Sequence, residues 1–149
     1  MDFIERVSND IKDAMRAKDQ VKLNSLRGLK KELIEAKTAK SADAILSEEE
    51  GLKIVQKMVK QRKDTAEIYR EQNRPDLLEQ ELAEAAAISI YLPAQMTEEE
   101  LVAAIKEIIA RTGATSAKEI GKVMGVASKE LAGKTEGREI SRVAKELLG

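Results

Sequence analysis

The chain has 149 residues, of which 42% are hydrophobic, 36% are charged and only 2% are aromatic. It contains no Cys and no His, which excludes disulfides, thiol nucleophiles, Ser-His-Asp triads and zinc sites with the usual ligands. The net charge of −1 argues against a uniformly basic nucleic-acid binder. The charge is nevertheless unevenly distributed. Residues 1–40 carry 10 basic and 7 acidic side chains, residues 41–100 carry 7 basic and 14 acidic ones, and residues 111–149 carry 8 basic and 5 acidic ones.

Apolar residues recur at helical spacing along the whole chain, and no segment has the alternating pattern of a strand. Residues 1–92 are predicted to form four helices. Capping boxes at Asp2 and Ser47 begin the first and third, and Pro75 begins the fourth. We expect a turn at 17–19, a loop at 38–44 and a long third helix at about 48–73. The predicted inward positions are Ile4, Val7, Ile11, Ala14 and Met15 in the first helix, and Leu78, Leu82, Ala85, Ala86 and Ile90 in the fourth, whose outer face carries Glu79, Glu81 and Glu84.

Pro93 marks the one clear boundary, because proline ends a helix and restricts the residue before it. A capping box at Thr97 begins the next helix, which is predicted to stop at Gly113. Ser116 with Glu119 is predicted to cap a second helix, and a turn at 133–137 leads to a last helix at 138–148. The sequence thus predicts an all-α protein with two domains: an N-terminal bundle of about four helices at 1–92 and a small three-helix domain at 93–149.

Glycine and lysine concentrate in one segment. Five of the eight glycines lie at positions 113, 121, 125, 133 and 137. Glycine allows close backbone approach and lysine supplies a mobile cation, so such a segment can form an anion-binding surface. The alternative is a pair of short helices with glycine caps and solvated lysines.

The same segment resembles the tail of the GatB/YqeY family, through Gly-Lys-Val-Met at 121–124, Gly-Lys-Thr-Glu-Gly-Arg at 133–138 and the final Leu147-Leu148. Upstream, Tyr91 to Leu101 resembles the junction motif of that family, and Arg74-Pro75-Asp76-Leu77 and Lys63-Asp64-Thr65 resemble its stand-alone YqeY branch. GatB is a subunit of the tRNA-dependent amidotransferase, and its helical tail touches the body of the tRNA. The resemblance therefore implies a helical protein of tRNA metabolism without the catalytic body of GatB. The absence of Cys fits a reducing compartment, and we expect the protein to be cytoplasmic.

The basic residues of this segment suit contact with RNA phosphates. They are Lys118, Lys122, Lys129, Lys134, Arg138, Arg142 and Lys145. No aromatic residue follows Tyr91, so base stacking is unavailable and recognition has to be of shape and backbone. The candidate tRNA-binding residues are Lys118, Gly121, Lys122, Gly125, Gly133, Lys134, Arg138 and Arg142. Acidic residues interleave with them, so a solvated face with ion pairs is the alternative.

Other functions receive less support. A P-loop at Gly133-Lys134-Thr135 would need glycine at Ser128 and a preceding strand. The acidic runs at 48–50 and 98–100 are explained by helix dipoles, so we expect no metal and no cofactor. No signal peptide and no apolar run of roughly 18 residues is visible, so we expect no membrane contact. Two alternatives remain: a protein-interaction module that docks on an aminoacyl-tRNA enzyme, and an auxiliary subunit of a carbon–nitrogen ligase that uses glutamine as amide donor with catalytic partners.

Overall fold

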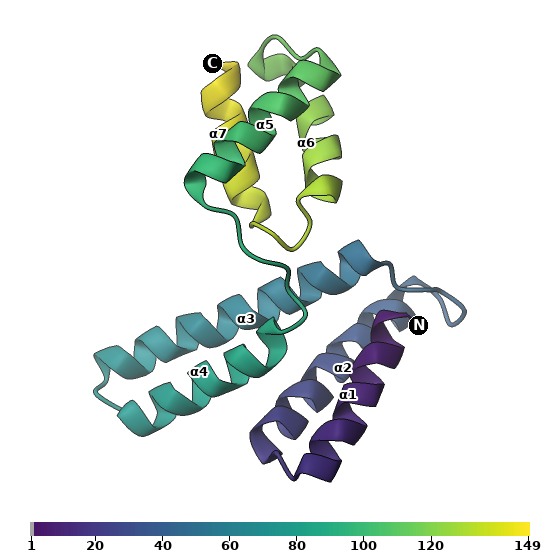
Figure 1. Cartoon of the computed structure of the whole chain (residues 1–149), viewed down its shortest axis with the longest axis vertical. Coiled ribbons are helices and arrows are strands. Elements are labelled where there is room, and N and C mark those ends of the chain that lie inside the picture. The colour runs from purple at the N-terminus through teal and green to yellow at the C-terminus, as the bar shows by residue number, and fades with distance from the viewer. Residues whose placement is uncertain (1) are drawn as a thin grey trace. The chain divides into compact units, whose positions relative to one another are not determined.

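A computed structural model describes residues 2–149, and over this range the protein is entirely helical, as predicted. Its elements are α1 (Phe3–Ala17), α2 (Gln20–Lys40), α3 (Glu48–Glu71), α4 (Pro75–Ser89), α5 (Glu98–Thr112), a 3-10 turn η1 (Ala117–Glu119), α6 (Ile120–Glu130) and α7 (Gly137–Leu148) (Figure 1). The chain divides into two compact units, of which the first ends at Tyr91 and the second spans Leu92–Gly149.

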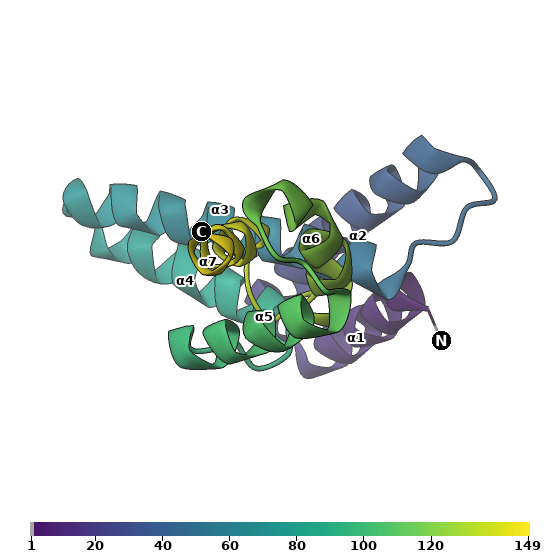
Figure 2. The ribbon, with the colours of Figure 1, turned by 90° about the horizontal axis from the view of Figure 1, so that it is seen from above.

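The first unit consists of two antiparallel hairpins, α1–α2 and α3–α4, and α4 also packs against α2 (Figure 1). The α2–α3 connection runs over residues 41–47 and is the long loop at the edge of Figure 2. It begins three residues later than the predicted loop at 38–44, because α2 continues to Lys40, whose ammonium lies 2.8 Å from the Glu50 carboxylate. The helix therefore gains a basic last turn and a partner in α3.

The predicted inward faces need two corrections. In α1, Met15 is 53% exposed, whereas Phe3, which the pattern missed, is 2% exposed and packs on Gly51 and the ring of Tyr91. In α4, Leu82 and Ala86 are exposed, as is Ile90 just after its end, whereas Ala85 is buried as predicted and Ile88 is buried beside it. The face of α4 that is buried is therefore not the face that the apolar pattern predicted.

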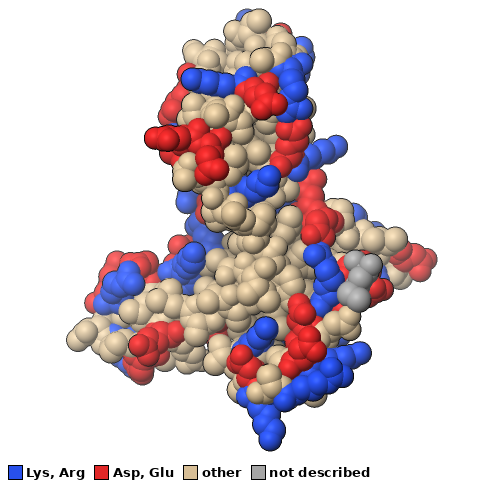
Figure 3. Space-filling model, in the orientation of Figure 1, with Lys and Arg blue, Asp and Glu red and all other residues tan. Residues whose placement is uncertain are grey.

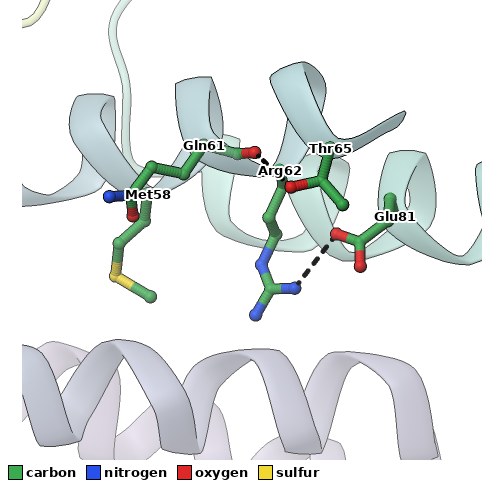
Figure 4. Close-up of a pocket in the computed structure, with 5 residues that line it drawn as sticks. All are labelled: Met58, Gln61, Arg62, Thr65 and Glu81. Carbon is green, nitrogen blue, oxygen red and sulfur yellow. Dashed lines mark hydrogen bonds and ion pairs between the residues drawn. The ribbon is translucent and has the colours of Figure 1, made fainter. Parts of the chain in front are cut away.

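The rotation of α4 is explained by a charge cluster in the α3–α4 hairpin. Arg62 of α3 binds both Glu81 and Glu84 of α4, and all three side chains are at most 27% exposed. The predicted acidic outer face is therefore wrong for Glu81 and Glu84, which turn toward α3. Figure 4 shows Arg62 and Glu81 with Met58, Gln61 and Thr65 at the mouth of a pocket beside this pair.

The second unit is a three-helix arrangement of α5, α6 and α7 around one apolar core. Its centre is formed by fully buried β-branched residues, namely Ile105, Val123 and Val143. The capping box at Thr97 is present, with the Glu100 amide donating to Thr97 Oγ1 and the Thr97 amide donating to Glu100 Oε1. The predicted Ser116 cap is wrong: Ser116 makes no capping hydrogen bond, and η1 precedes α6 while Glu119 accepts from the Thr115 amide at 2.7 Å.

Candidate nucleic-acid interface

The candidate residues of the second unit fall on α6, on the turn that follows it and on α7. Along η1 and α6, Lys118, Lys122, Gly125 and Lys129 recur at spacings of four, three and four residues, which places them on one helical stripe. Gly121 lies one turn before Gly125. We call Lys118, Gly121, Lys122, Gly125 and Lys129 the α6 face.

The two glycines of the α6 face are not required by packing. A Cβ atom built on Gly121 or Gly125 would meet no heavy atom within 4 Å, and neither residue has a positive φ. Each glycine costs a helix about 1 kcal/mol relative to alanine. Because these two positions have no side chain, a ligand can approach the backbone of α6 closely in the space between the lysine side chains.

The turn after α6 is held by the segment that leads into α5. Gln95 donates its side-chain amide to the Gly133 carbonyl at 2.7 Å, and the Met96 amide donates to the Lys134 carbonyl at 3.0 Å. Gly133 has φ of +77°, in the region that favours glycine. These contacts fix the backbone beneath the exposed side chain of Lys134. Sequence reasoning missed Gln95 and Met96, because no local pattern relates them to a turn almost 40 residues later.

The cations of this unit differ in how far their charge is already neutralised. Lys118, Lys129 and Lys134 form no ion pair with any residue that the structure describes, and Lys122 lies 3.8 Å from Glu119 at the limit of an ion pair. Arg138 is 71% exposed, with Nε 2.9 Å from Glu136. The α6 face and Lys134 thus contribute three lysines without an ion pair among the described residues, and Lys106 and Lys145 of the same unit are two more.

Arg142 is the exception among the predicted residues. Its guanidinium lies 2.7 Å from Glu98 of α5, 2.9 Å from Glu139 and 3.3 Å from Glu146. The contacts with Glu98 and Glu139 raise the pKa of Arg142. Arg142 thus links the start of α5 to α7, and its charge is less available to a ligand than that of the lysines.

The face shown in Figure 3 carries no single large basic field. On the face shown in Figure 3, Lys and Arg side chains interleave with Asp and Glu side chains. Among the described residues no group of three or more acidic side chains is placed to hold a metal ion, and no helix is long and apolar enough to cross a membrane. Any phosphate contact would therefore be local, at clusters such as the α6 face.

Comparison with known proteins gives a family for the whole chain. The family model described as "Yqey-like protein" matches residues 4–148. The curated proteins named "Altered inheritance of mitochondria protein 41, mitochondrial" are similar in part: 32% identity over 88 residues in Pyrenophora tritici-repentis and 34% over 96 residues in Lachancea thermotolerans. These matches cover 59% and 62% of this chain but 48% and 49% of the relatives, so they span about half of each relative. Both names refer to mitochondria, and the cytoplasmic location predicted above stays a prediction.

Proposed function

We propose that this chain, which belongs to the Yqey-like protein family, is an accessory protein of tRNA metabolism that binds the body of tRNA through its second unit. The observation that carries the proposal is the α6 face, where two glycines that the packing does not need lie among three lysines. Lys118 and Lys129 form no ion pair with any described residue, and Lys122 lies 3.8 Å from Glu119. Such a surface suits a folded nucleic acid, whose phosphates lie at fixed positions.

The α6 face supplies two complementary features. Gly121 and Gly125 remove side-chain bulk, so a phosphate or ribose can approach the helix backbone. Lys118, Lys122 and Lys129 then reach the neighbouring phosphates as mobile point charges. Lys134 extends the same charge beyond the end of α6, on a turn that Gln95 and Met96 hold in place.

The ligand class follows from what the unit lacks. The second unit has no aromatic residue, so unpaired bases have no ring to stack on and a single-stranded sequence would gain little. A folded RNA presents phosphates and 2′-hydroxyls at fixed positions, which lysines and an open helix backbone can match. Duplex DNA has no 2′-hydroxyls, so we expect the surface to favour RNA over DNA.

The test is binding of the full chain to bulk tRNA over a series of salt concentrations, beside the variant Lys118→Ala/Lys122→Ala/Lys134→Ala. We expect affinity to fall with salt, and the salt slope of the variant to be smaller by about 2 to 3, since each lost phosphate contact removes about 0.7 to 0.9. The matched control is Lys12→Ala/Lys18→Ala/Lys63→Ala, which removes three exposed first-unit lysines that form no ion pair with any described residue. Equal loss in both variants, or no binding at low salt, would contradict the proposal.

A further inference from the structure

The first unit carries a groove along the α1–α2 hairpin that the tRNA proposal does not use. Its volume is about 420 Å³, and it is lined by Ile11 of α1 and by Arg27, Lys30, Lys31, Ile34 and Glu35 of α2. Ile34 is 42% exposed and Ile11 is half-buried. The groove thus contains aliphatic surface that the packing of the unit leaves uncovered.

The α2 side of the groove is a single helical face. Arg27, Lys30, Lys31, Ile34 and Glu35 recur at the i, i+3, i+4, i+7 and i+8 positions, so they line one side of α2 together. A partner that lies along the groove would therefore meet basic side chains, then an aliphatic one, then a carboxylate, in a fixed order.

The groove has an excess of positive charge that the fold leaves unused. Arg27, Lys30 and Lys31 form no ion pair with any described residue, whereas Arg6, Lys40 and Arg62 of the same unit each bind a carboxylate of another helix. Glu35 is the one acid in the lining and also forms no ion pair within the described chain. The three cations are therefore available to carboxylates of a ligand.

We propose that this groove binds an acidic amphipathic helix of a partner protein. Apolar side chains one turn apart on that helix would fill the groove beside Ile11 and Ile34, and carboxylates flanking them would meet Arg27, Lys30 and Lys31. Glu35 favours a basic side chain at one end of the bound helix, which fixes its direction.

The shape and lining favour a protein helix over the other polyanions of the cell. The aliphatic residues offer no stacking surface to RNA bases, and phosphate contacts alone would leave Ile34 uncovered. Binding to a bilayer scales with the apolar area that inserts, and Ile34 is the one exposed large apolar residue in this lining. A helix supplies apolar and acidic groups at the spacing that the groove presents.

The experiment measures binding of the full chain to a fluorescent synthetic peptide of about 18 residues, or about five helical turns, with Leu along one face and Glu beside it. Arg27→Glu/Lys30→Glu tests the charge, and Ile34→Ala tests the apolar contact at constant charge. Lys18→Glu/Lys63→Glu is the control with the same charge change outside the groove, and circular dichroism checks that every variant is folded. A peptide with Lys in place of Glu tests the sign of the charge.

We expect the acidic peptide to bind saturably, with a loss of roughly tenfold or more in Arg27→Glu/Lys30→Glu and a smaller loss in Ile34→Ala. The control should retain affinity, and the lysine peptide should not bind. No saturable binding, equal loss in the control, or an unchanged affinity in Ile34→Ala would overturn the proposal. A further outcome is that anionic vesicles or tRNA displace the peptide and themselves bind Arg27→Glu/Lys30→Glu more weakly than the wild type. That result would overturn the proposal and identify the groove as a site for the displacing ligand. Displacement by tRNA would also count against tRNA binding by the α6 face, whereas the other outcomes concern the groove alone.

Discussion

Gly51 and Gly28 both lie inside helices of the first unit, but only Gly51 is required by the packing. A Cβ atom on Gly51 would lie 2.8 Å from Cδ2 of Phe3, whose ring is 2% exposed, whereas a Cβ atom on Gly28 would meet nothing within 4 Å. Gly28 lies in the middle of α2 and Gly51 in the first turn of α3. The sequence cannot show which of them the packing requires, because this depends on the ring of Phe3, almost 50 positions before Gly51.

This difference predicts opposite effects of the same substitution. Gly51→Ala should lower the free energy of unfolding by about 1 to 2 kcal/mol, because overpacking against Phe3 outweighs the gain in helix propensity. Gly28→Ala should raise it by about 0.5 to 1 kcal/mol. Urea denaturation measures both, and a Gly51→Ala variant as stable as Gly28→Ala would contradict the packing at Phe3.

Glu50 provides a prediction about pH. The Lys40 ammonium and the Ser47 hydroxyl and amide lower the pKa of Glu50 from 4.5 to about 2. Because the folded-state pKa is depressed, the carboxylate stabilises the fold above about pH 4.5, and this contribution disappears as the pH falls toward 2.

In Glu50→Gln we therefore expect a free energy of unfolding below that of the wild type at pH 7, with the difference shrinking between pH 4.5 and pH 2. Urea denaturation across this range measures the difference. Glu79→Gln, at an exposed residue without an ion pair in the described chain, is the control. A difference that stays constant down to pH 2 would contradict the role of Glu50 at the start of α3.

At the scale of elements, the caps were predictable and the rotation of one helix was not. Ser47 and Thr97 begin α3 and α5 with complete capping boxes, which are local patterns of four residues. The orientation of α4 depends on Arg62 of another helix, so its own amphipathic pattern indicated the wrong face. Charge pairs between helices carry no periodic signal.

The Arg62 cluster predicts a marked effect on stability. Arg62→Ala should lower the free energy of unfolding by about 1 to 3 kcal/mol, because Glu81 and Glu84 stay largely buried without a cation. Urea denaturation is the measurement. Arg62→Leu/Glu81→Gln/Glu84→Gln should recover most of the loss. Arg70→Ala, which breaks an exposed pair with Glu67, should change the value by at most about 0.5 kcal/mol, and an equal loss there would contradict the account.

Substitution of the two α6 glycines should affect folding stability and tRNA affinity in opposite directions. Gly121→Ala/Gly125→Ala should raise the free energy of unfolding by about 1 to 2 kcal/mol, since both sites are open and alanine favours the helix. The same variant should bind tRNA more weakly, because two methyl groups cover the helix backbone. Denaturation and tRNA titration measure the two effects, and undiminished tRNA affinity would remove the glycines from the proposed interface.

At the scale of the whole molecule, two predictions from the sequence are confirmed. The described residues form helices and no strand, and the family model matches residues 4–148. The candidate binding residues at 118–142 could be predicted because the glycine–lysine pattern is local in the sequence. It could not reveal that Arg142 is engaged by Glu98, or that Gln95 holds the Gly133 turn, since these contacts join residues about 40 positions apart. Free and engaged cations look alike in a sequence.

Binding of tRNA through the α6 face can be mapped by backbone amide NMR of the ¹⁵N-labelled full chain titrated with tRNA. We predict shifts and line broadening concentrated in residues 117–138, with Gly121 and Gly125 among the most affected because their backbone is open. The first-unit amides should change little beyond the uniform broadening of a larger complex. Changes centred on the first unit, or spread evenly over both units, would contradict the claim.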